Sequence, residues 1–191
     1  DFLDATQLTD VSELQYADVS NVVLIHGFLR GCHYITSEML KDAIGGWNLG
    51  NLQIIEQFAY YSDSFTDLSF FEKQTFPKLY SLWQAFSEMK TITSLHGLEN
   101  ADFSHVTNMV STFNGCVALS DMTALSNKDL SSVTSMELCF NNCRFTNVDF
   151  LAGVNPTSLT DVTAMLRNCI LLQNVDGLSG WASHITAMAE N

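Results

Sequence analysis

A motif that returns every 26 to 30 residues is the sequence feature that most constrains the fold. It is clearest where Ser-His-Val-Thr-Asn-Met at residues 104–109 is followed by Ser-Ser-Val-Thr-Ser-Met at residues 131–136. If the Val of the motif is taken as an anchor, one aliphatic residue marks each unit: Val22, Leu52, Leu79, Val106, Val133, Leu159 and Ile185. A unit of this size cannot bury its apolar face alone, so neighbouring units must stack to share a core. The sequence therefore predicts a single solenoid domain over residues 1–191, with about seven units.

Further apolar columns follow each anchor at distances of three, seven and ten residues. This spacing is typical of one face of an α-helix, so it predicts a short amphipathic helix in every unit. The apolar residues after it, as in Leu119-x-x-Met122-x-x-Leu125, predict a short strand or extended segment. The expected fold class is an α/β repeat. The residues expected in its core include Val106, Met109, Phe113, Cys116, Val133, Met136, Phe140, Cys143 and Cys169.

The repeated letters resemble the BspA-like leucine-rich repeat surface proteins, whose units carry Ser-x-Val-Thr-x-Met, then Phe-x-x-Cys, then Leu-x-x-Leu. In one unit the residues that match this motif are Ser104, Val106, Thr107, Met109, Phe113, Cys116 and Leu119. The next two units have the same or similar residues at most of these positions. The match is good over residues 100–188 and moderate over residues 18–99. The resemblance implies a leucine-rich-repeat-like solenoid displayed on a bacterial or protist surface for adhesion or binding.

The charge of the chain disfavours nucleic acids as partners. It carries 21 acidic and 8 basic side chains, for a net charge of −13, and phosphate backbones are bound through Lys and Arg. Anionic membrane surfaces are disfavoured for the same reason. No apolar run reaches the ~18 residues of a membrane span, so no transmembrane segment is expected. Because the repeat begins and stops in mid-pattern, we expect a piece of a longer protein, and the resemblance to the BspA-like proteins implies an extracellular or cell-surface location.

The five cysteines allow two interpretations. Cys32, Cys116, Cys143 and Cys169 share one column of the repeat, ten residues after the anchor. They are expected to be small buried side chains that fill a tight layer of the core. The alternative is a disulfide between adjacent units, which an extracellular setting would permit. The spacing of the cysteines and histidines is not that of a zinc site.

A polar column precedes the anchors by four residues and also allows two interpretations. It contains Asp18, Asn48, Asp102, Asp129 and Asn155. Asp and Asn side chains often accept a hydrogen bond from the backbone two residues on, which predicts a turn at each position. The weaker alternative is a ladder of calcium ligands built on Asp18, Asp102 and Asp129, since calcium prefers carboxylate oxygens. No other metal site and no cofactor is expected.

Aromatic residues provide the candidate binding site. Tyr60, Tyr61, Phe70 and Phe71 lie in a segment with more aromatic side chains than one buried face can hold. Exposed aromatic groups on a rigid surface make contacts to proteins or sugar rings at low entropic cost. The alternative is that this unit packs a larger core.

These features predict a non-enzymatic binding or adhesion module, because no nucleophile and base pair or phosphate-binding loop stands out. The expected partner is a protein or glycan on another cell or on the matrix. The alternative is a structural element of a filament or surface layer, in which further copies of the chain stack through the ends of the repeat.

Overall fold

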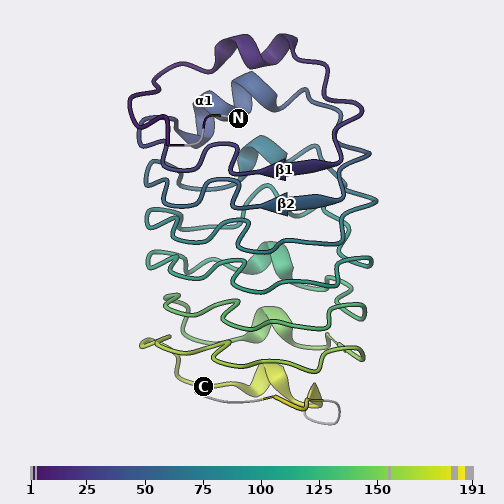
Figure 1. Ribbon diagram of the computed structural model, residues 1–191. Helices are drawn as coiled ribbons and strands as arrows, with labels where there is room; N and C mark the ends of the chain where they lie inside the picture. Colours follow the sequence, from purple (N-terminus) through teal and green to yellow (C-terminus); the bar gives the residue numbers. More distant parts are fainter. Residues whose placement is uncertain (1, 3, 155, 182–184, 188–191) are drawn as a thin grey trace.

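The computed structural model describes residues 2, 4–154, 156–181 and 185–187, and its backbone is mostly irregular. Within these residues there is one α-helix, one small parallel sheet and a set of short 3-10 helices (Figure 1). In chain order the elements are η1 (Ser12–Tyr16), β1 (Leu24–His26), α1 (Ser37–Ile44), β2 (Ile54–Glu56), η2 (Ser69–Phe71), η3 (Thr123–Leu125), η4 (Asp149–Leu151) and η5 (Asp176–Leu178).

The chain winds in turns that lie one above the next, and we call the residues from one anchor to the next a coil (Figure 1). Strand β1 pairs with β2 in parallel, with Leu24 opposite Ile54. Isolated parallel bridges carry this pairing through the later coils: Ile54 to Ser81, Ser81 to Asn108, Asn108 to Ser135, Ser135 to Asp161 and Asp161 to Ala187. Every residue in this series lies two places after an anchor. Equivalent positions of the sequence repeat therefore pair with one another in neighbouring coils.

The predicted helix after each anchor is wrong. Residues 106–116 contain one bridge residue, Asn108, followed by consecutive turns. They do not form a helix, because two positions in each coil adopt a left-handed backbone that a right-handed helix excludes. These positions lie five and nine residues after the anchor, at Ser111 (φ 55°) and Gly115 (φ 75°) in this coil. The same pair recurs at Gly27 and Gly31, Gln57 and Tyr61, Gln84 and Glu88, Leu138 and Asn142, and Ala164 and Asn168. Each turn returns an apolar side chain to the core after three or four residues, which is the spacing that a helix would also give.

Backbone hydrogen bonds alternate between neighbouring coils and local turns. The N–H of Ser111 donates to Glu137 O at 2.8 Å, and the N–H of Phe113 donates to Cys139 O at 2.9 Å, both in the next coil. Between them, the N–H of Thr112 donates to Met109 O at 3.3 Å and closes a turn within its own coil. Irregular backbone is therefore satisfied without regular secondary structure.

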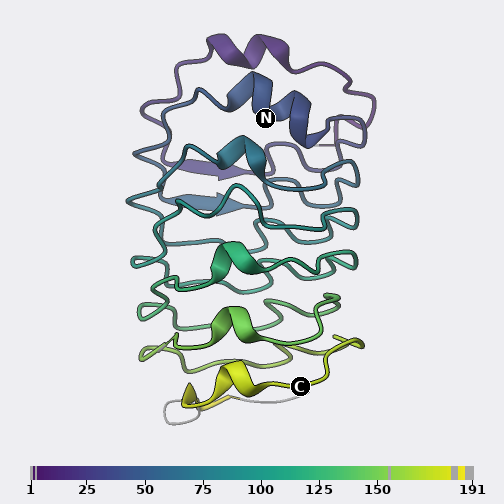
Figure 2. The same cartoon turned by 180° about the vertical axis from the view of Figure 1, so that it is seen from behind.

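In the described part of the chain, a helical piece lies in the second half of every coil except the third, residues 79–105, at the place where a strand or extended segment was predicted. Helix α1 is capped by Thr36, whose side chain accepts from Met39 N at 3.3 Å. In the second, fourth, fifth and sixth coils this place holds a single 3-10 turn, and the pieces stack in one column behind the sheet (Figure 2). An Asp or Asn starts several of these turns, as Asp121 does by accepting from Thr123 N at 3.0 Å before η3.

The core is a continuous apolar column that is rich in phenylalanine. Phe86, Phe113 and Phe140 occupy one position in successive coils, with ring centroids 5.7 and 5.9 Å apart in stacked geometry. Towards the N-terminal end the column widens around Phe58, which contacts Phe70 and Phe71. All the residues expected in the core are buried: Val106, Met109, Phe113, Cys116, Val133, Met136, Phe140, Cys143 and Cys169.

Candidate functional site

Tyr60 and Tyr61 form an aromatic pair at a corner of the second coil. Their ring centroids lie 4.5 Å apart with an interplanar angle of 78°. Tyr61 is 48% exposed and Tyr60 is partly buried. Burial, followed by the hydrogen bond with Tyr61, raises the pKa of Tyr60, so the Tyr60 phenol is neutral at physiological pH. The pair presents two aromatic surfaces with polar hydroxyl groups on a stacked scaffold.

Two cations flank the pair, and neither was predicted from the sequence. The guanidinium of Arg30 lies 5.6 Å from the ring centroid of Tyr60, and the ammonium of Lys90 lies 5.7 Å from that of Tyr61. Gln57 Oε1 accepts from Arg30 Nη1 at 3.3 Å and helps to orient it. Arg30 could have been found in the sequence, because it stands eight residues after its anchor as Tyr60 does. Lys90 belongs to a different column, and only the fold brings it to Tyr61.

The backbone of Tyr61 is left-handed, with φ at 61°. This is the position nine residues after the anchor, where four of the other five coils place Gly or Asn (Gly31, Gly115, Asn142 and Asn168) and the fifth places Glu88. Gly and Asn adopt this conformation most readily, whereas a bulky side chain is disfavoured in it. Tyrosine at this position therefore does not serve the backbone, and this points to a role for its side chain.

Phe70 and Phe71 do not contribute to an exposed contact site. Both lie in η2, with exposures of 1% and 0%, and their ring centroids lie 5.6 and 5.2 Å from that of Phe58. The 3-10 turn directs both adjacent side chains into the wide part of the core. The candidate surface is thereby reduced to Tyr60 and Tyr61.

The polar column before the anchors makes turns. Asp18, Asp102 and Asp129 accept from the backbone N–H two residues on, at 3.0, 2.9 and 2.9 Å, and Asn48 does so at 3.1 Å. Hydrogen bonds from the side chains of Ser20, Ser104 and Ser131, followed by these backbone bonds, lower the pKa of the three carboxyl groups. Within the described residues, no three His, Cys, Asp or Glu side chains gather as a metal site, so the calcium ladder has no structural support. Asn155 lies outside the described residues.

The cysteine column forms a ladder of thiol hydrogen bonds. The thiols of Cys116, Cys143 and Cys169 donate to the carbonyl of a phenylalanine in the preceding coil, at 3.1, 3.4 and 3.0 Å. Ser62 replaces Cys in the second coil and makes the equivalent bond, from its Oγ to Leu29 O at 2.7 Å. All five cysteines are free and buried. Burial raises the pKa of Cys116 to about 12 and that of Cys169 to about 11, so neither thiol is a ready nucleophile.

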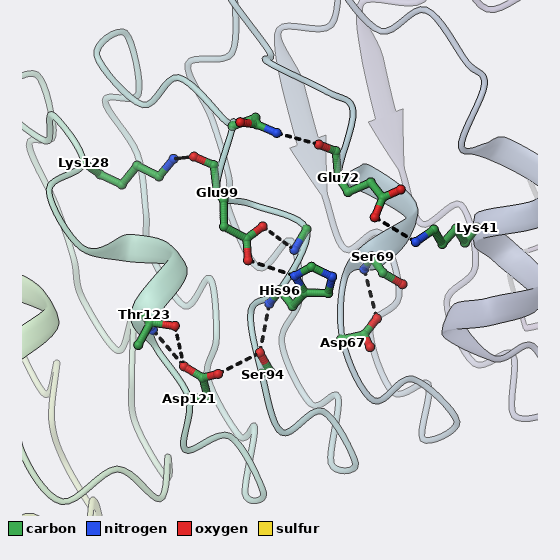
Figure 3. A network of polar contacts seen from close by, with 12 residues as sticks. Lys41, Asp67, Ser69, Glu72, Ser94, His96, Glu99, Asp121, Thr123 and Lys128 are labelled. Carbon is green, nitrogen blue, oxygen red and sulfur yellow. Dashed lines mark hydrogen bonds and ion pairs between the residues drawn. The ribbon is translucent and has the colours of Figure 1, made fainter.

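A polar network spans several coils near the 3-10 column (Figure 3). His96 Nδ1 lies 2.9 Å from Glu99 Oε1, and the other carboxylate oxygen of Glu99 accepts from Gly97 N at 2.7 Å. Lys41 Nζ pairs with Glu72 Oε2 at 2.7 Å, and Lys128 Nζ donates to Glu99 O at 2.6 Å. Both carboxylates are hydrogen-bonded within the protein, so the network joins neighbouring coils.

A family described as "Mycoplasma protein of unknown function, DUF285" matches residues 80–191, which is more than half of the chain. The chain belongs to the DUF285 family. No curated protein matches it. The DUF285 match includes Lys90 and the stacked cysteines, whereas Arg30, Tyr60 and Tyr61 precede it.

None of the helices in the described part of this DUF285 chain combines the length and the apolar character that crossing a bilayer requires. The family description names no activity, and the tyrosine pair is the candidate functional site of this DUF285 chain.

Proposed function

We propose that this chain is a non-enzymatic binding or adhesion module, displayed on a cell surface or secreted, and built as a leucine-rich-repeat-like solenoid similar to the BspA-like proteins. Its coils would serve as a rigid scaffold, and Tyr60 and Tyr61 would contact a protein or glycan on another cell or matrix.

The observation that carries the proposal is the left-handed backbone of Tyr61 combined with its 48% exposure. The residue neither fills the core nor suits its backbone conformation. Tyrosine provides a large, rigid contact surface that loses little side-chain entropy on binding. A half-exposed tyrosine on a repeat scaffold therefore fits a recognition surface better than a structural position.

The matched variants Tyr61→Asn and Leu138→Asn test this proposal. Both replace a side chain at a left-handed position with one that tolerates it, but Leu138 (φ 55°) lies in a different coil. The labelled chain and its variants are applied to an array of oligosaccharides and to purified matrix proteins. We expect Tyr61→Asn to lose binding and Leu138→Asn to retain it. Binding that survives Tyr61→Asn, or a wild-type chain that binds neither set, contradicts the proposal.

Light scattering separates this function from self-assembly. A binding module stays monomeric as its concentration is raised. Oligomers or fibres that grow with concentration would instead support the structural element of a filament or surface layer.

A further inference from the structure

We propose that the tyrosine pair and its two cations form a site for a saccharide that carries a carboxylate. This inference rests on the proposed binding function and names the class of its ligand. The ring of the sugar would lie against Tyr61, and its carboxylate would be held by Lys90 or Arg30.

The distribution of positive charge supports an acidic group in the ligand. The chain has only eight Lys and Arg residues among 191, and two of them flank this one pair of rings. Lys90 is exposed, and none of the ion pairs among the described residues includes it. Its ammonium is therefore free to pair with a carboxylate that approaches over Tyr61.

Arg30 is the second cation and is oriented before a ligand binds. Its side chain is 37% exposed, and its Nε lies 3.8 Å from Asp4 Oδ1. That pair is long and solvent-exposed, so it is weak and leaves the guanidinium able to contact a second carboxylate. A planar guanidinium also suits the two oxygens of a carboxylate.

The backbone at this corner favours a sugar over an extended peptide. The N–H of Tyr60 donates to Gln57 O, and Tyr60 O accepts from Gly31 N at 2.9 Å. The N–H of Ser62 is bonded to Ala59 O at 3.0 Å. A peptide that docks by main-chain hydrogen bonds needs an open strand edge, whereas Tyr61 lies in a turn and the N–H groups on either side of it, those of Tyr60 and Ser62, bond within their own coil. A sugar instead needs aromatic faces and side-chain polar groups, which the pair and its cations provide.

The experiment compares sialylated and uronate-containing oligosaccharides with their neutral counterparts, including sialyllactose with lactose, by titration against the folded chain. We expect the acidic sugars to bind at least about tenfold more tightly, since a hydrogen bond to a charged group contributes ~1.5–3 kcal/mol. Lys90→Gln and Arg30→Gln should each reduce that preference. Tyr61→Asn should remove the binding of both the acidic and the neutral sugars. Lys73→Gln and Tyr16→Ala, which alter an exposed lysine and an exposed tyrosine elsewhere, should change neither.

Thermal melting of every variant shows whether it is folded. Equal affinity for acidic and neutral sugars overturns the inference but leaves a glycan-binding function in place. Binding of oligoglutamate through the same residues, with affinity equal to that for the acidic sugars, identifies an acidic-peptide site and also overturns it. If no acidic sugar binds, the inference fails; binding to matrix proteins that is lost in Tyr61→Asn would then still support the proposed function.

Discussion

The thiol of Cys116 donates to the carbonyl oxygen of Phe86, 30 residues earlier in the chain, at 3.1 Å. The same bond recurs in two later coils and is made by a hydroxyl in an earlier one, from Ser62 to Leu29. In these coils the column is thus defined by hydrogen-bond donation between coils as well as by small size, whereas the third coil has Met89, which is not a donor, at this place.

Substitution of Cys116 should show this dual role. Cys116→Ser retains a donor and should lower the free energy of unfolding by less than Cys116→Ala, by a difference of about 1 kcal/mol. Cys116→Val fills the volume without a donor and separates the two contributions. Chemical denaturation measures all three. If Val is tolerated better than Ser, packing alone decides the position.

The buried thiols should resist alkylation in the folded protein. Burial raises the pKa of Cys116 to about 12 and that of Cys143 well above its usual value, so at about pH 8 almost no thiolate is present. With iodoacetamide, we expect intact-mass spectra to show no labelling of these two residues under native conditions and full labelling in denaturant. Rapid native labelling of Cys116 would show that the coils open there.

Gly97→Ala should be strongly destabilising. Gly97 has φ at 111°, and a Cβ there would collide with the carbonyl oxygen of Leu68 in the preceding coil. We expect a loss of at least about 3 kcal/mol, because both strain and a backbone clash contribute. Gly46→Ala is the control, since nothing lies within 4 Å of the new methyl group, and its effect should stay within ~0.5 kcal/mol. Equal melting temperatures for the two variants would contradict the close approach of these coils.

The pair of His96 and Glu99 should make stability depend on pH. The hydrogen bond to Glu99 raises the pKa of His96, so its contribution is full below the unfolded pKa of ~6.5 and is lost as pH rises through the folded value. The pKa of Glu99 is lowered: burial opposes the shift, but hydrogen bonds from His96 and the backbone outweigh it, so its contribution is lost as pH falls through the folded value.

His96→Gln isolates this effect. The His96 side chain is 54% exposed, so we expect a loss of only ~0.2–1 kcal/mol near pH 6, and a smaller one near pH 9. Melting temperatures of both proteins across this range give the comparison. If the difference in melting temperature between the two proteins increased towards high pH, it would contradict a stabilising pair of protonated His96 and Glu99.

The sequence predicted the register of the stack and its core, but it assigned the local structure wrongly. Aliphatic and aromatic columns at fixed distances from Val106 identified which residues face inward. They could not distinguish a helix from a series of turns, because both return a side chain to the same face every three or four residues. The left-handed backbone of Leu138 and Ala164 decides between them, and neither residue type signals that conformation.

The sequence predicted only part of the candidate site, again because it does not reveal the conformation of the turns. Tyr60 and Tyr61 were found from the excess of aromatic residues, but composition does not say which aromatic side chains a turn directs outward. Phe70 and Phe71 are buried because η2 places both against Phe58. The second polar column, at Asp67, Asp121 and Asn147, was missed because its turns start 3-10 helices where strands were expected.

By itself, the sequence determined the period of this protein, the positions that face its core and the acidic character of its surface, because stacking imposes the same polarity at each repeat. Tertiary structure alone decided the backbone conformation of each coil and the surroundings of Tyr61. Lys90 lies 29 residues beyond Tyr61 and meets its ring only because neighbouring coils are in register.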